Sequence, residues 1–236
     1  MRNSSCMHKK LYIRQLPVGP MANFVYLVGA ADSEEAVLMD ASWEAERIME
    51  AAQEDKKRLT AIVLTHVHYD HVQALPKLVE LLKIPVFLQQ AEMDFLQAWS
   101  QGPLSPSFCP QFCALLKTSP ETFQAVQGDA RIALAGVEMQ MLLTPGHTVG
   151  GQCILVQQAL FTGDILFVGA CGRVDLPGGD VQQLYKSLNE KLKVLPAETL
   201  IFPGHDYGEA PVSSLEKELK SNPYLQDKAG FFSLRT

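Results

Sequence analysis

The sequence lacks long apolar runs, excess positive charge and a regular cysteine framework, and each absence excludes a class of protein. No apolar run approaches the roughly 18 residues that a membrane-spanning helix needs, so we expect no membrane partner. The net charge of −6 argues against nucleic-acid binding, which needs a basic face. The polar segment Met1–Lys10 lacks the apolar core of a signal peptide, so we expect a cytoplasmic protein.

The five cysteines are odd in number and irregularly spaced, which predicts free thiols rather than disulfides. Cys109 and Cys113 could form a redox or metal pair, or could be two thiols in a loop or short helix. We favour the thiols, because no second pair completes a zinc site. The 236 residues are 47% hydrophobic, enough for a sizeable core, and no low-complexity linker divides them, so we expect a single domain over residues 1–236.

Five of the six histidines lie in three short motifs. The motifs are Thr-His-Val-His-Tyr-Asp-His at residues 65–71, Thr-Pro-Gly-His-Thr at 144–148 and Phe-Pro-Gly-His-Asp-Tyr at 202–207, with Phe-Thr-Gly-Asp at 161–164 between the last two. Imidazole and carboxylate are ligands of zinc and iron. The sequence therefore predicts a metal site whose candidate ligands are His66, His68, Asp70, His71, His147, Asp164 and His205.

Alternating strand-like and helix-like segments indicate an α/β fold. In the first half, apolar runs between turn residues predict strands at Leu11–Leu16, Asn23–Val28, Ala36–Met39, Ala61–Leu64 and Pro85–Leu88. Helical spacing of apolar residues predicts a helix over Trp43–Asp55, capped by Ser42, and another around Leu75–Leu82. The first histidine motif follows the strand at 61–64, at the end where open α/β layers place their sites.

An irregular, proline-rich stretch at residues 100–130 separates the halves, and we expect either a lid or insertion near the substrate site or a surface excursion with a short helix. Strands are then predicted at Arg131–Leu134, Val137–Leu143, Gln152–Val156, Ala159–Phe161 and Thr199–Phe202. Capping boxes starting at Asp180 and Ser213 predict the last two helices, the first of them reaching about residue 193.

The ordered set His-x-His-x-Asp-His, lone His, Asp and lone His resembles the metallo-β-lactamase superfamily. The resemblance implies a four-layered αββα sandwich and two divalent metal ions, zinc first, with iron or manganese as alternatives. It implies that His66, His68 and His147 hold one ion, that Asp70, His71 and His205 hold the other, and that Asp164 bridges them. Asp70 is also a catalytic candidate that orients a hydroxide or passes a proton to the leaving group. Asp40 is either a carboxylate supporting a ligand histidine or a turn aspartate.

Two branches of that superfamily share features with this chain. The segments Leu16–Met21 and Gly163–Arg173 resemble glyoxalase II, the hydroxyacylglutathione hydrolases, whereas pieces of Leu184–Leu225 resemble persulfide dioxygenases, which use one iron. In both branches a basic residue at the position of Arg173 meets a glutathione carboxylate; the alternative is a structural salt bridge to Asp175 or Asp180. Tyr207 either lines the substrate pocket or is a half-buried tyrosine.

These resemblances predict a metal-dependent hydrolase of the glyoxalase II type, acting on a small-molecule thioester such as a glutathione conjugate. The chain departs from glyoxalase II in having only 31 residues after His205, too few for that family's helical domain. The alternatives are an iron-dependent persulfide dioxygenase, a lactonase or β-lactam hydrolase, and a binding protein with a dead site. The acyl group, the physiological metal and the oligomeric state stay open at this point.

Overall fold

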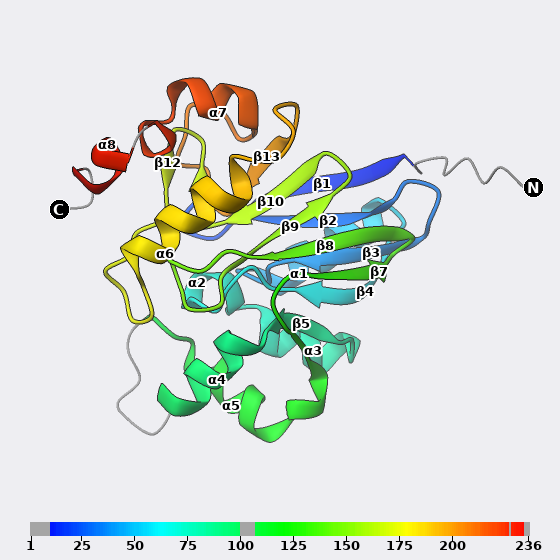
Figure 1. Cartoon of the computed structure of the whole chain (residues 1–236). Helices are drawn as coiled ribbons and strands as arrows, with labels where there is room; N and C mark the ends of the chain where they lie inside the picture. The colour runs from blue at the N-terminus through cyan, green and yellow to red at the C-terminus, as the bar shows by residue number, and fades with distance from the viewer. Residues whose placement is uncertain (1–9, 100–106, 227, 234–236) are drawn as a thin grey trace, which may run out of the picture.

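The computed structural model describes residues 10–99, 107–226 and 228–233, and two six-stranded sheets form its centre (Figure 1). The first sheet consists, in spatial order, of β1 (Leu11–Val18), β2 (Asn23–Ala30), β3 (Glu35–Met39), β4 (Arg58–Val63), β5 (Val86–Gln89) and β6 (Phe123–Val126). Strands β3 to β6 pair in parallel, and parallel neighbours need crossover connections. Those connections contain α1 (Ala45–Glu54), α2 (Tyr69–Val72), α3 (Leu75–Leu82), α4 (Gln90–Trp99) and α5 (Pro110–Thr118).

The second sheet consists, in spatial order, of β14 (Ser213–Ser214), β13 (Leu200–Pro203), β10 (Ala159–Gly163), β9 (Gln152–Val156), β8 (Val137–Leu143) and β7 (Ala130–Leu134). Strands β10 and β13 are parallel, and α6 (Val181–Lys186), continued as a π-helix over Ser187–Leu192, lies in the crossover between them. The hairpin of β11 (Leu166–Phe167) and β12 (Ala170–Cys171) precedes that helix, and α7 (Leu215–Ser221) and α8 (Lys228–Ser233) end the described chain.

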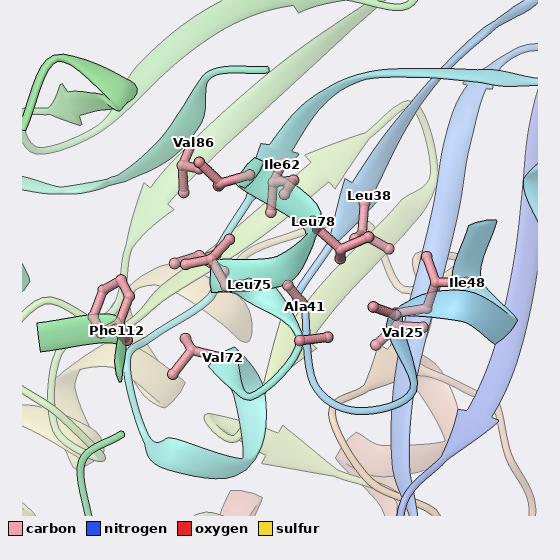
Figure 2. Packing of buried hydrophobic residues seen from close by; sticks show 14 of the residues in the cluster. Val25, Leu38, Ala41, Ile48, Ile62, Val72, Leu75, Leu78, Val86 and Phe112 are labelled. Atoms are coloured by element: carbon pink, nitrogen blue, oxygen red, sulfur yellow. The ribbon is translucent and has the colours of Figure 1, made fainter. Parts of the chain in front are cut away.

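Three groups of buried apolar side chains hold these layers together. One lies between the sheets, where the Tyr26 and Phe161 ring centroids are 5.0 Å apart, edge to face. A second packs the helices of the first half against the first sheet, with Ile62, Leu75 and Phe112 fully buried (Figure 2). The third does the same for the second sheet. Each fully buried side chain of this size contributes about 1.5–3 kcal/mol, and the predicted four-layered αββα sandwich is confirmed.

Two predicted helix starts are wrong by one or two residues. The residue that caps α1 is Glu44, with a left-handed φ of 56°, because the Ser42 carbonyl is instead tied to the Ala74 amide (2.8 Å). Helix α7 is capped by Ser214, whose side chain accepts the amide of Lys217, because the hydroxyl of Ser213 instead donates to Glu218 (2.6 Å). The predicted cap at Asp180 is confirmed: its carboxylate accepts the amides of residues 182 and 183 at 2.7 and 2.9 Å.

The proline-rich stretch contains more regular structure than its sequence suggests. Residues 107–130 include α5 and β6, and β6 pairs with β5, so this end of the stretch belongs to the first sheet. Cys109 caps α5 and Cys113 lies within it, both as free thiols in the short helix that the sequence allowed. Residues 100–106 lie outside the described residues, and the lid stays a prediction. Within the described ranges, no helix is both long and apolar enough to cross a membrane.

Candidate metal centre

All seven candidate ligands follow the carboxyl ends of strands at one rim of the sandwich. The motif at residues 66–71 follows β4 of the first sheet, while His147, Asp164 and His205 follow β8, β10 and β13 of the second. An isolated backbone bridge between Asn23 and His205 joins the two sheets at this rim. The fold therefore brings together residues that are up to 139 positions apart (205 − 66).

The glycines of the two Pro-Gly-His motifs are required by close approach. A Cβ on Gly204 would lie 2.6 Å from Asp164 Oδ1 and 2.9 Å from the ring of His71. Gly146 has a φ of +137°, and a Cβ there would lie 2.2 Å from the backbone nitrogen of Leu184. Both glycines thus let a turn that carries a histidine pack directly against a neighbouring segment of the same chain.

The donor atoms of these side chains form three overlapping groups, and within each the atoms lie within 4.8 Å of one another. The groups are His66–His68–His147, Asp70–His71–His205 and, spanning the two, His66–His71–Asp164. Nε2 of His71 lies 3.2 Å from Nε2 of His205 and 3.2 Å from Oδ1 of Asp164. Ligands about 2.0–2.1 Å from a tetrahedral zinc ion are roughly 3.3 Å apart, so this spacing fits a metal ion.

Hydrogen-bond partners fix which ring nitrogen faces the centre in three of the five histidines. Three rings donate Nδ1–H to oxygen atoms that accept: His71 to Asp40 (2.9 Å), His205 to the Met21 carbonyl (2.9 Å) and His147 to the Arg173 carbonyl (2.7 Å). In a neutral ring, Nε2 then carries a lone pair. Nε2 of His66 is buried and finds no hydrogen-bond partner among the described residues. Lone pairs converging in this way fit a cation.

Burial keeps the first group neutral. It lowers the pKa of His68 to about 3, with a further contribution from the neighbouring His147. Burial also lowers the pKa of His66 and His147. Neutral imidazole is the form that binds a metal.

Carboxylates dominate the second group. Burial alone would lower the pKa of His205, but Asp164 and Asp70 raise it to about 9, and they likewise raise the pKa of His71. Burial would raise the pKa of both aspartates, but His71 and His205 hold these pKa values well below their usual range. The centre therefore carries negative charge that either protons on His71 and His205 or a metal ion can balance.

Asp40 takes the supporting role that the sequence left open. Its carboxylate contacts Nδ1 of His71 and accepts the amide (2.7 Å) and hydroxyl (2.8 Å) of Thr65. A carboxylate in this place fixes the tautomer and direction of the His71 ring.

A cavity of about 540 Å³ opens beside the ligands, and apolar side chains such as Met21, Phe167 and Leu176 form much of its wall. Tyr207 also lines it and stacks on His205, with ring centroids 4.4 Å apart. Arg173 reaches the cavity, but Asp175 holds its guanidinium in a two-point salt bridge of 2.7 and 2.5 Å.

Sequence reasoning missed three side chains around the centre. Asn23 donates to Asp70, Trp43 donates to Asn23, and buried Glu92 accepts from Thr148 and from the amide of residue 150. Each stands alone in its segment, without a repeat or spacing that marks it. Only the fold brings them to the ligands.

The sequence matches the family described as the Metallo-beta-lactamase superfamily over residues 18–205. It is 32% identical over 205 residues to the "Probable polyketide biosynthesis zinc-dependent hydrolase BaeB" of Bacillus velezensis, covering 87% of this chain and 82% of that protein. It is 30% identical over 207 residues to a "Hydroxyacylglutathione hydrolase" of Idiomarina loihiensis, covering 88% of this chain and 70% of that protein.

Solved structures give a consistent comparison. ETHE1 from Myxococcus xanthus superimposes with a TM-score of 0.76 at 30% identity, covering 95% of this chain and 89% of that one. TTHA1623, in a di-iron-bound form, superimposes with a TM-score of 0.70 at 31% identity, covering 90% of this chain and all of that one. The zinc in the name of BaeB and the iron in the description of TTHA1623 belong to those relatives.

Proposed function

The chain belongs to the metallo-β-lactamase superfamily and is a metal-dependent hydrolase of that superfamily; from this premise we propose that it hydrolyses thioesters at a centre of two divalent ions. The observation that carries the proposal is the pair of three-residue donor groups joined by a third that contains Asp164. We assign His66, His68 and His147 to one ion, Asp70, His71 and His205 to the other, and Asp164 to both. Zinc is our first assignment, with iron and manganese as alternatives.

The chain's own residues then divide the chemical work. Bound divalent ions would supply a hydroxide near neutral pH and a Lewis acid for the carbonyl oxygen. Asp70, whose pKa is held low, stays a carboxylate that orients the nucleophile. A thiolate is a good leaving group, so little acid catalysis is required beyond a proton returned through Asp70.

The cavity supports an acyl thioester as the substrate. Its apolar wall suits an acyl chain or the carbon skeleton of a thiol. We propose that Tyr207 forms part of the binding surface and that Arg173 lies at its edge. Arg173 is a weaker candidate for binding a glutathione carboxylate than the sequence suggested, because its guanidinium already donates two hydrogen bonds to Asp175. The glyoxalase II relative keeps glutathione thioesters among the candidates.

The test is metal content together with thiol release. We expect protein purified without chelator to hold two equivalents of metal and to release free thiol from S-lactoylglutathione or from an acyl-N-acetylcysteamine. Asp164→Asn should abolish the release, whereas Tyr12→Phe, a change at the hydrogen bond to Asp55, should not. One equivalent of iron, with oxygen consumed on a glutathione persulfide, would instead identify a persulfide dioxygenase, the activity that the resemblance to that branch offers as the second candidate.

A further inference from the structure

We propose that Asn23, held by Trp43, is a positioning residue that aims the Asp70 carboxylate at the second metal position and thereby determines the occupancy of that position. Asn23 is fully buried at the start of β2. Its Nδ2 donates to Oδ2 of Asp70 at 2.9 Å, and its Oδ1 accepts from Nε1 of Trp43 at 2.9 Å. The inference rests on the two-metal centre of the proposed function but not on the thioester substrate.

The orientation of the Asn23 amide follows from chemistry. An indole N–H can only donate, so the amide atom facing Trp43 must be the oxygen. The NH₂ group therefore faces Asp70, whose carboxylate can only accept. Replacing the indole N–H would remove one of the two hydrogen bonds that hold the amide, and the contact with Asp70 would be left to orient Asn23 alone.

The atom that receives this hydrogen bond is the one that faces the second group. Oδ2 of Asp70 lies 3.3 Å from Nε2 of His205 and 3.5 Å from Nε2 of His71. The terminal torsion of an aspartate is broad, so the side chain alone does not hold that oxygen in place. Asn23 supplies the missing restraint, and its backbone bridge to His205 ties the same residue to a second ligand of the group.

Trp43 is itself built into the site. Gly19 has a φ of +66°, and a Cβ there would lie 2.1 Å from the indole ring. The amide of Gly19 donates to Glu44, next to Trp43, at 2.9 Å. The turn between β1 and β2 thus packs on the tryptophan that orients Asn23. The two residues that support Asp70, Asn23 and Trp43, therefore both lie outside the histidine motifs.

The experiment is a Co²⁺ titration of metal-free protein, followed by visible absorption and calorimetry. Asn23→Ala should weaken binding of the second equivalent by about 10–100-fold, the usual effect of removing a partner of a ligand. The first equivalent, on His66, His68 and His147, should bind as before. Trp43→Phe keeps most of the ring packing and should weaken the same equivalent by a smaller factor, even if Asn23→Ala does not fold. Tyr12→Phe, which also removes one hydrogen bond to a carboxylate, is the matched control.

Binding of both equivalents as in the wild type in both variants would overturn the inference. Equal weakening of both equivalents would overturn it as well, since that result describes general loosening. A wild-type protein that takes up no second equivalent would refute the two-metal centre and this inference with it. A wild-type protein that binds two equivalents but cleaves no thioester would refute only the thioester proposal.

Discussion

At the scale of single residues, Arg173 lies in the cavity wall with its guanidinium already paired, and our proposal places it at the edge of the substrate site. Its salt bridge to Asp175 is exposed, with side-chain exposures of 61% and 64%, so the pair contributes at most about 1 kcal/mol. A substrate carboxylate must nevertheless displace Asp175 and then lie beside it. The guanidinium is thus available only in competition with its own neighbour.

Asp175→Asn should release that guanidinium. We expect KM for S-lactoylglutathione to fall by up to about fivefold, the factor that corresponds to 1 kcal/mol. KM for an uncharged acyl-N-acetylcysteamine should stay unchanged, because that thiol has no carboxylate. Steady-state kinetics on both substrates measure the difference, and a parallel change in the two KM values would contradict the explanation.

The contact between Asp40 and His71 makes a second prediction at this scale. Asp40→Asn can present an N–H to Nδ1 and so favour the wrong tautomer of the His71 ring. Metal affinity should fall by about 10–100-fold, as competition with a chromophoric chelator would measure. Thr65→Ser, which keeps the hydroxyl bond to Asp40, is the control and should bind metal normally.

The residue scale also shows what sequence can predict. Metal ligands are restricted to a few side-chain types, so the order of these types along the chain is enough to single out seven side chains that the fold then brings together. Asn23 and Trp43 carry no such signature. Their role exists only because the β1–β2 turn folds over the rim and brings an ordinary amide against Asp70.

At the scale of elements, helix α4 supports the loop that carries His147. Glu92, in its first turn, is 1% exposed and accepts from Thr148 and from the amide of residue 150. Burial raises the pKa of Glu92 to about 7, although these hydrogen bonds oppose the shift. The sequence predicted neither α4 nor this contact, because the segment has no strong apolar period and its role depends on a loop more than 50 positions away.

A raised pKa makes this element sensitive to pH. The folded state binds the Glu92 proton more tightly than the unfolded state, so the contribution is complete below about pH 4.5 and is lost as pH rises through about 7. The shift corresponds to about 3 kcal/mol. Compared with Glu92→Gln, the wild type should lose that much stability between those pH values and no more above them. Urea unfolding of both proteins between pH 4.5 and pH 8 measures this difference in stability. If the stability of the two proteins changed with pH in the same way, Glu92 would not be the group that causes the loss.

At the scale of the whole molecule, the strand pattern predicted an α/β fold but not that two sheets pack face to face. The contact of Tyr26 with Phe161 joins positions 135 apart (161 − 26), and no local period encodes such a contact. The αββα sandwich was predicted from the family resemblance alone, and the apolar side chains between the two sheets are what hold it together. Since the candidate ligands come from both sheets, we expect metal binding to stabilise the whole fold rather than one element.

Chelation therefore tests the molecule as a unit. Metal at about 1,000 times its Kd stabilises the folded state by about 4 kcal/mol, which for a chain of this length corresponds to a Tm roughly 8–16 °C above that of metal-free protein.

In metal-free protein the pKa of His205 is raised to about 9, so its proton stabilises the fold below about pH 6.5, and this contribution is lost as pH rises through 9. On our assignment, a bound metal ion would replace that proton. The Tm difference between loaded and chelated protein, measured by scanning calorimetry, should consequently widen from pH 6.5 to pH 9, and a constant difference would show that no histidine proton is exchanged for the metal.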